Sequence, residues 1–163
     1  MARDQAQAFT AGQLLCGRFR VLRFIARGGM GEVYAARDLE LDVEVALKTI
    51  RDEVAASQDA WRRFKREVNL ARQVTHPNVC RIFDLFSHRD EHGEVQHFVT
   101  MELLEGETLA RYLRREGRLT TREALPLVEQ VTRALATAHR AGVVHRDLKP
   151  ENVFLVEDAS GQR

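Results

Sequence analysis

The feature that most constrains the fold is a glycine-rich turn between two strand-like segments. Apolar side chains recur through residues 19–25 and 32–37, and Gly28, Gly29 and Gly31 lie in the connection between them. In dinucleotide-binding folds the comparable glycines open a helix, and a Walker A loop needs a Gly-Lys-Ser/Thr sequence that this turn lacks. The turn therefore predicts an antiparallel hairpin and disfavours both of those fold types.

The composition is that of a soluble globular chain with one domain, or a piece of one. Its 163 residues are 44% apolar and 30% charged, a mixture that can bury a core. The 25 Lys and Arg residues and 24 Asp and Glu residues nearly cancel. This balance argues against nucleic acid or an anionic membrane surface as a partner.

Nothing in the sequence predicts export or a membrane segment. The longest stretch without a charged residue, residues 5–17, is shorter than the roughly 20 apolar residues of a membrane-spanning helix. We therefore expect a cytoplasmic protein. Cys16 and Cys80 stand alone in the sequence, which indicates reduced structural thiols and no metal site.

A third strand and a helix follow the hairpin. Residues 43–50 are expected to form a strand whose period of two places Lys48 on the same face as Ala46. Residues 60–74 are expected to form a helix with Glu67 in the middle of its apolar stripe. The stripe consists of Ala60, Phe64, Ala71 and Val74. A carboxylate that faces a core needs a cation, and Lys48 is the best local candidate.

The remaining elements complete an α+β pattern. Strands at residues 79–86 and 95–103 bring the expected antiparallel sheet to five strands with one main helix. A short helix is expected at 108–115, and a long helix begins near Thr120, where Thr120 and Glu123 have the spacing of a capping box. The expected buried stripe of the long helix consists of Ala124, Val128, Val131, Leu135 and Ala138.

Four motifs occur in the order found in protein kinases. They are the turn with Gly28, Gly31 and Val33, the strand sequence VALK ending at Lys48, the helical Glu67, and the sequence HRDLKPEN at residues 145–152. Across residues 19–156 the chain resembles bacterial eukaryotic-type serine/threonine protein kinases. One departure is Ala26, which stands where the loop of the family usually has its first glycine.

The resemblance implies that the first half of the chain binds ATP. Lys48 would hold the α- and β-phosphates and Glu67 would orient Lys48, whereas a solvated strand lysine is the alternative interpretation. The loop that would cover the phosphates consists of Ala26, Arg27, Gly28, Gly29, Met30 and Gly31. The side chains that would enclose the adenine are Ile25, Val33 and Ala46, although all three are also consistent with an ordinary strand core.

The resemblance also implies a segment that links two lobes, at residues 98–106. Met101 would guard the back of the nucleotide pocket. The backbone carbonyl of Glu102 and the backbone amide of Leu104 would bind the edge of the adenine. An edge strand running into a loop would have a similar sequence, so this assignment rests on the resemblance alone.

The catalytic chemistry is implied for the second half of the chain. Asp147 would accept or orient the proton of the substrate hydroxyl, Lys149 would lie beside the γ-phosphate, and Asn152 would bind Mg²⁺. A lysine two residues after the aspartate is typical of serine/threonine kinases. The implied function is therefore transfer of the γ-phosphate of ATP to Ser or Thr hydroxyls of a protein substrate.

The resemblance divides the chain into three parts. Residues 1–18 would be an N-terminal lead-in, residues 19–104 the N-lobe and hinge, and residues 105–163 the first helices of an α-helical C-lobe. Because no Asp-Phe-Gly or Ala-Pro-Glu sequence follows Asn152, we expect an incomplete catalytic domain that is inactive by itself. Autophosphorylation or dimerisation would be properties of the full protein.

Two other functions remain open at this point. A nucleotide-binding pseudokinase or regulatory module would share the fold, although such proteins commonly lose one of the residues corresponding to Lys48, Glu67, Asp147 and Asn152. A small-molecule phosphotransferase would share the nucleotide lobe, but it typically carries a different catalytic loop. The complete HRDLKPEN sequence argues against that last class.

Overall fold

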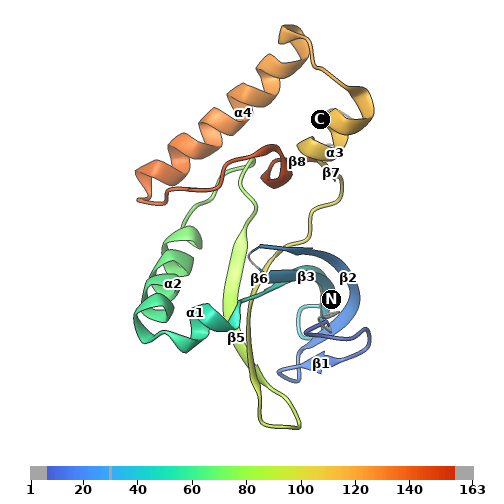
Figure 1. Cartoon of the computed structure of the whole chain (residues 1–163), viewed down its shortest axis with the longest axis vertical. Coiled ribbons are helices and arrows are strands. Elements are labelled where there is room, and N and C mark those ends of the chain that lie inside the picture. The colour runs from blue at the N-terminus through green and yellow to red at the C-terminus, as the bar shows by residue number, and fades with distance from the viewer. Residues whose placement is uncertain (1–6, 30, 157–163) are drawn as a thin grey trace, which may run out of the picture. The chain divides into compact units, whose positions relative to one another are not determined.

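The computed structural model of the chain describes residues 7–29 and 31–156 and divides into two compact units (Figure 1). The first unit comprises residues 1–72 and 81–103, and the second comprises residues 73–80 and 104–163. This division differs from the expected parts in three places, one of which is that Leu104 groups with the second unit and not with the first. The segment before residue 19 belongs to the first unit, where Phe9 and Leu15 are buried in the core. Residues 73–80 group with the second unit.

An antiparallel sheet forms the first unit, with its strands in the order β1-β2-β3-β4-β6-β5. Their bounds are β1 Leu14–Leu15, β2 Phe19–Gly28, β3 Gly31–Asp38, β4 Val43–Thr49, β5 Ile82–Arg89 and β6 Val95–Glu102. Within the described residues the sheet has six strands and not the expected five, because β1 pairs with the start of β2. The expected glycine-rich hairpin is confirmed as β2 and β3.

Strand β4 lies between two apolar cores. The first core consists of Phe9, Leu15, Phe19, Val21, Tyr34, Ala36, Val45, Leu47 and Phe98. The second consists of Ile50, Val68 and Val99, with further half-buried side chains around them. Since successive side chains of a strand point to opposite faces, Val45 and Leu47 enter the first core, while Lys48 lies on the face of the second.

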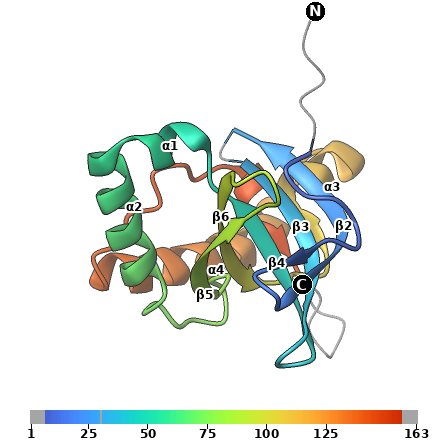
Figure 2. The same cartoon turned by 90° about the horizontal axis from the view of Figure 1, so that it is seen from below.

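Two helices connect β4 to β5, and the second of them covers one face of the sheet (Figure 2). They are α1, Asp52–Ala56, and α2, Gln58–Ala71. The side chain of Ser57 accepts a hydrogen bond from the backbone N–H of Ala60, at 3.3 Å, and so caps α2. The expected helix at 60–74 therefore begins earlier and ends at Ala71.

The expected stripe of α2 is wrong in phase. Trp61, Phe64 and Val68 face the second core, a set with the spacing i, i+3 and i+7. Glu67 precedes Val68 by one residue and is exposed. One residue corresponds to a rotation of about 100° around a helix, so Glu67 lies beside the apolar stripe and not in its middle.

The second unit contains two helices and a small sheet. Helix α3 spans Leu109–Glu116, α4 spans Thr121–Arg140, and the short 3₁₀ helix η1 spans Pro150–Asn152. The capping box of Thr120 and Glu123 is confirmed at the start of α4. The expected stripe of α4 is only partly correct, because Val128 is 58% exposed while Ala134 is buried. Residues 157–163, at the end of the second unit, lie outside the described residues.

The small sheet pairs two segments that are far apart in the sequence. Strand β7, Glu107–Thr108, pairs with β8, Phe154–Leu155, in antiparallel register. Gly106 precedes β7 with a φ of +150°, and a Cβ atom at this position would lie 2.1 Å from the carbonyl oxygen of Leu155. Only glycine permits such a close approach of the two backbones. No helix in the described residues is long and apolar enough to span a membrane.

Candidate functional site

The register of the sheet gathers most of the proposed adenine-binding side chains on one face, which we call the Lys48 face. Val33 pairs with Lys48 across β3 and β4, and Ala46 pairs with Met101 across β4 and β6. Ala26 pairs with Val33 across the hairpin. Because directly paired residues share a face, Ala26, Val33, Ala46, Lys48 and Met101 line one surface. The other residues of this set thus form an apolar surface beside the half-buried side chain of Lys48.

Ile25 is the adenine-binding candidate that the register does not place. A register shift lies between the pairs of Phe24 and Ala26, and Ile25 falls at this irregularity. Its side chain is 39% exposed. A bulge of this kind re-aims one side chain, which explains why simple alternation along β2 cannot assign Ile25 to a face.

Glu67 lies in the same unit as Lys48. Its neighbour Val68 packs in the second core with Val99, and Val99 is the residue of β6 that pairs with Lys48. The helix therefore docks next to the strand position that carries Lys48. The side chain of Glu67 lies at the exposed border of this contact.

The glycine-rich turn is held tightly at its C-terminal end. Gly31 has a φ of +128°, and a Cβ atom there would lie 2.3 Å from the carbonyl oxygen of Thr49. The backbone N–H of Glu32 also donates a hydrogen bond of 2.8 Å to the hydroxyl of Thr49. By contrast, a Cβ atom at Gly28 or Gly29 would meet nothing within 4 Å. Met30 lies outside the described residues.

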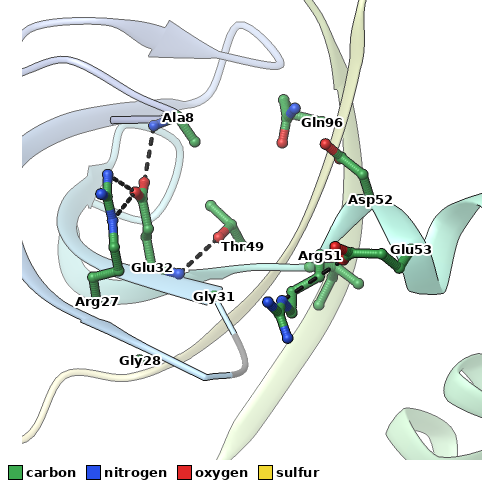
Figure 3. A pocket seen from close by; sticks show the side chains of 11 residues that line it. Ala8, Arg27, Gly28, Gly31, Glu32, Thr49, Arg51, Asp52, Glu53 and Gln96 are labelled. Carbon is green, nitrogen blue, oxygen red and sulfur yellow. Dashed lines mark hydrogen bonds and ion pairs between the residues drawn. The ribbon is translucent and has the colours of Figure 1, made fainter. Parts of the chain in front are cut away.

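A pocket of about 420 Å³ lies behind the turn (Figure 3). Its wall includes three of the residues expected to cover the phosphates, Arg27, Gly28 and Gly31, together with the side chain of Glu32. Lys48 is not part of this wall. Glu32 and Val33 are consecutive residues of a strand, so the pocket opens on the face of the hairpin opposite to the Lys48 face.

The linking segment begins at the end of β6. Met101 is half-buried in β6, and Glu102 is the last residue of that strand. The backbone N–H of Glu102 donates to the carbonyl of Arg81 at 2.9 Å, and its carboxylate accepts from the backbone N–H of Arg81 at 3.2 Å. Leu104 follows outside any helix or strand and is half-buried. The first unit ends at Leu103, one residue before Leu104.

In the second unit, the three residues expected to act in catalysis lie together. The Nζ atom of Lys149 is 2.9 Å from Oδ2 of Asp147. The Nδ2 atom of Asn152 donates to the carbonyl oxygen of Asp147 at 2.8 Å and to Oδ2 of Asp147 at 3.0 Å. The hydrogen bond from Lys149, followed by that from Asn152, lowers the pKa of Asp147 below its ordinary value. Asp147 is therefore an ionised carboxylate at neutral pH.

The backbone of this loop is strained at one position. Arg146 has a φ of +59°, in the left-handed region that a residue with a Cβ atom seldom adopts. Such a conformation costs of order 1–3 kcal/mol and persists only when the surrounding structure enforces it. Here, the pairing of β7 with β8 and a 2.8 Å hydrogen bond from the Leu109 N–H to the Val153 carbonyl anchor the chain that follows the loop.

The donor set fits a role for Asn152 in binding magnesium. Within the described residues, the side chain of Asn152 makes two hydrogen bonds, and both use its Nδ2 atom as the donor. The amide oxygen of Asn152 is therefore a suitable metal ligand. Mg²⁺ is commonly held by one or two protein oxygens together with substrate phosphates and water. In the described part of the chain no group of three His, Cys, Asp or Glu side chains could hold a metal.

Sequence reasoning missed a buried polar cluster behind the glycine-rich turn. Glu32 is 8% exposed and accepts hydrogen bonds from Arg27, Tyr34 and the backbone of Ala8. The alternation of β3 could have indicated that Glu32 and Tyr34 share the core-facing side of the strand. No local signal could have placed Ala8 beside them.

Comparisons with known proteins identify the family of the chain. The family described as "Protein kinase domain" matches residues 19–161. The chain is 41% identical over 144 residues to the serine/threonine-protein kinase PrkC of Bacillus subtilis, covering 88% of this chain and 22% of that protein. It is 43% identical over 150 residues to the serine/threonine-protein kinase pkn2 of Myxococcus xanthus, covering 92% of this chain and 17% of that protein.

A solved structure gives the same result for the fold. The crystal structure of the Mycobacterium tuberculosis PknI kinase domain matches with a TM-score of 0.79 and 30% sequence identity. The match covers 96% of this chain and 60% of that kinase domain. The chain thus spans about a fifth of the length of the two bacterial kinases, and rather more than half of the solved kinase domain.

Proposed function

The chain belongs to the protein kinase family, and from this premise we propose that it binds ATP and takes part in transfer of the γ-phosphate to Ser or Thr hydroxyls of a protein. The observation that carries the proposal is the cluster of Asp147, Lys149 and Asn152, in which Lys149 and Asn152 each place a polar atom within 3.0 Å of Asp147. Phosphoryl transfer needs positioning and charge stabilisation more than covalent chemistry, and these residue types supply both.

The Lys48 face is the proposed binding surface for the nucleotide. Ala26, Val33 and Ala46 give a flat apolar surface suited to a purine ring, and Ile25 at the bulge would add to its border. Met101 would limit the depth of the site, with backbone groups of Glu102 and Leu104 binding the edge of the ring. Lys48 would neutralise the α- and β-phosphates, and Glu67 would orient Lys48.

The glycine-rich turn is the proposed cover for the phosphates. Gly28 and Gly29 leave open space where other residues would carry a side chain, so their backbone N–H groups can approach an anion closely. Ala26, Arg27, Met30 and Gly31 complete this loop. The alanine at position 26 restricts the start of the loop more than a glycine would.

Asp147 is proposed to orient the hydroxyl that attacks. Because Lys149 lowers its pKa, Asp147 is an ionised carboxylate and a weak base, which suits orienting a hydroxyl through a loose transition state more than removing its proton early. Lys149 carries a positive charge to the same place, where the transferred phosphoryl group would develop charge. When bound, Mg²⁺ would neutralise the phosphates, with Asn152 as its protein ligand.

Specificity for Ser and Thr hydroxyls rests on two observations. Lys149 follows Asp147 by two residues, as in serine/threonine kinases, and both bacterial relatives carry that description in their names. A small-molecule phosphotransferase is disfavoured by the complete HRDLKPEN sequence. A purely regulatory nucleotide-binding module is disfavoured because Lys48, Glu67, Asp147 and Asn152 all remain. The proposed location is the cytoplasm, where ATP is available.

The test has a binding step and a transfer step. Isothermal titration of the chain with ATP, with and without Mg²⁺, measures binding, and Lys48→Met is expected to abolish it. Transfer of radiolabelled phosphate to a generic basic protein, and to the chain itself, is then measured with the product of the complete coding sequence. Absence of transfer, or transfer that Asp147→Asn leaves unchanged, would reject the proposed activity. Binding that persists without transfer would instead favour the regulatory module.

A further inference from the structure

A buried carboxylate lies behind the proposed phosphate-binding turn. Arg27 and Glu32 are paired directly across the hairpin, one pair before Gly28 and Gly31. The Nε atom of Arg27 lies 2.7 Å from Oε1 of Glu32 (Figure 3). This ion pair therefore joins the two strands at the base of the turn.

The carboxylate of Glu32 accepts hydrogen bonds from two further groups besides Arg27. Its Oε2 atom accepts a hydrogen bond of 2.9 Å from the backbone N–H of Ala8 and another from the hydroxyl of Tyr34. Burial alone would raise the pKa of Glu32, but these hydrogen bonds and the one from Arg27 outweigh burial and lower the pKa. A buried carboxylate with several donors is expensive to replace, because each donor would lose its partner.

The segment that contains Ala8 is itself anchored in the core. The backbone N–H of Phe9 donates to the hydroxyl of Tyr34 at 3.1 Å. The ring of Phe9 is 1% exposed and lies 5.4 Å from the ring of Tyr34 and 5.9 Å from that of Phe98. Ala8 and Phe9 thus form a fixed support behind the hairpin.

The backbone of Glu32 contacts β4, the strand that carries Lys48. Its backbone N–H binds the hydroxyl of Thr49, the residue after Lys48, and Gly31 packs against the carbonyl of Thr49. One residue therefore connects three parts of the first unit: the N-terminal segment, the turn and β4. A shift of Glu32 would move the turn relative to Lys48.

We propose that Glu32 is a positioning residue: clamped by Ala8 and Tyr34, it holds the glycine-rich turn at the distance from Lys48 that nucleotide binding needs. This role deepens the proposed function and rests on it. Glu32 itself touches no nucleotide, because its side chain lies on the face of the hairpin opposite to Val33. Its effect is on nucleotide affinity, through the geometry of the turn.

The first measurement follows the geometry of the turn directly. Hydrogen exchange is followed on peptides that cover residues 26–34 in the chain without nucleotide. Glu32→Gln keeps the size of the side chain but removes its charge, and Ala8→Pro removes the N–H donor of Ala8 and fixes its φ. Both variants are expected to speed exchange in these peptides several-fold. Glu44→Gln, at an exposed carboxylate of β4, is the matched control and should leave exchange unchanged.

The second measurement is nucleotide affinity by titration with ATP and Mg²⁺. Glu32→Gln and Ala8→Pro are expected to weaken affinity about 5- to 10-fold, about 1–1.4 kcal/mol, and Glu32→Gln is also expected to lower the melting temperature, because donors to the buried carboxylate lose their partner. Faster exchange with weaker binding supports the role. Unchanged exchange and affinity, or a lowered melting temperature with unchanged affinity, would overturn it. Failure of the wild type itself to bind ATP would reject the proposed function, and the positioning role with it.

Discussion

The two units of the chain hold their proposed functional residues by different means. In the first unit, Lys48 lies on a strand between two apolar cores, and its neighbours in the sheet are fixed by register. In the second unit, the loop with Asp147 is held by polar contacts among its own residues and by one short pair of strands. Among the described apolar residues, the second unit buries only Val74, Ala134 and Leu155.

This difference determines how substitutions should act. A core distributes the effect of a change over many contacts, whereas a local network of hydrogen bonds loses its geometry when one member is removed. We therefore expect first-unit substitutions to separate into those that affect nucleotide binding and those that affect stability. Second-unit substitutions in the loop should act on transfer with little effect on stability.

The largest expected effect is that of Lys48→Met, which tests the first unit. Transfer should fall to the assay background, because the cation proposed to hold the phosphates is lost. The fold should remain, since methionine can pack beside Val33 and Val99. Radiolabelled transfer by the product of the complete coding sequence and circular dichroism measure the two outcomes. Lys65→Met, at an exposed position of α2, is the control. Wild-type turnover in Lys48→Met would contradict the assignment.

Glu67→Gln should lower transfer in the same direction, but less severely than Lys48→Met.

Asp147→Asn tests the second unit. Its rate of transfer should fall about 10²- to 10⁴-fold, the usual contribution of a positioned acid or base, while the Kd for ATP stays the same. Asn152→Ala should differ, because loss of the proposed magnesium ligand would weaken Mg²⁺-dependent binding and turnover together. Titrations with and without Mg²⁺, combined with initial rates, separate the two variants. Equal losses of ATP affinity would show that the division of roles is incorrect.

Glycine substitutions compare the two units directly. Gly31→Ala would place a Cβ atom 2.3 Å from Thr49 O, and Gly106→Ala would place one 2.1 Å from Leu155 O. Each should lower the free energy of unfolding by about 2 kcal/mol, from clash and positive φ. Urea denaturation followed by fluorescence and by exchange in each unit measures the effect. Gly28→Ala, where nothing lies within 4 Å, is the stability control. If Gly28→Ala lowered the free energy of unfolding by as much, the clash with a nearby backbone could not be the cause of the losses at Gly31 and Gly106.

The buried carboxylate of Asp38 gives the first unit a dependence on pH. Arg18 binds Asp38 through two hydrogen bonds of 2.9 and 2.7 Å and, with the backbone N–H of Glu40, lowers the pKa of Asp38. A pKa that is lower in the folded state stabilises the fold at neutral pH, and this contribution is lost as the pH falls through the folded pKa. Asp38→Asn should cost about 1.5 kcal/mol at pH 7 and flatten the loss of stability in acid. Urea midpoints between pH 7 and pH 3 measure both, and parallel curves for variant and wild type would contradict the assignment.

The smallest expected effect is that of Val128→Ala in α4. Because Val128 is 58% exposed, its truncation should change the free energy of unfolding by less than about 0.5 kcal/mol. Val68→Ala, at a buried position of α2, should cost about 2 kcal/mol. A loss at Val128 as large as that at Val68 would show that α4 buries a different face in solution. Thermal unfolding of the two variants is sufficient to compare them.

Sequence patterns predicted the parts of the fold that are fixed by interactions between residues close together in the chain. The hairpin at Gly28–Gly31 and the capping box at Thr120 and Glu123 depend on residues within a few positions of one another, and both were predicted. The sequence of residues 145–152 predicted a catalytic loop; its role stays a prediction, while the structure brings Asp147, Lys149 and Asn152 together.

The features of the fold that the sequence did not predict depend on residues far apart in the chain. Strands β1, β7 and β8 contain two residues each and exist only through pairing, so no periodicity could indicate them. The buried faces of α2 and α4 are selected by what each helix packs against, and the sequence pattern allowed a neighbouring face. Glu67 was therefore expected at the centre of a stripe that is in fact centred beside it.

The alternation of side chains between the two faces of β4 also restricts how this chain can vary in length. Inserting or deleting one residue between Val43 and Lys48 would turn Lys48 toward the first core and bring Leu47 to the surface that needs the cation. Gene variants with such a change should be eliminated by selection even when Lys48 itself is retained. The turn between β5 and β6, residues 90–94, has no such constraint, so length differences among homologous genes are expected to accumulate there.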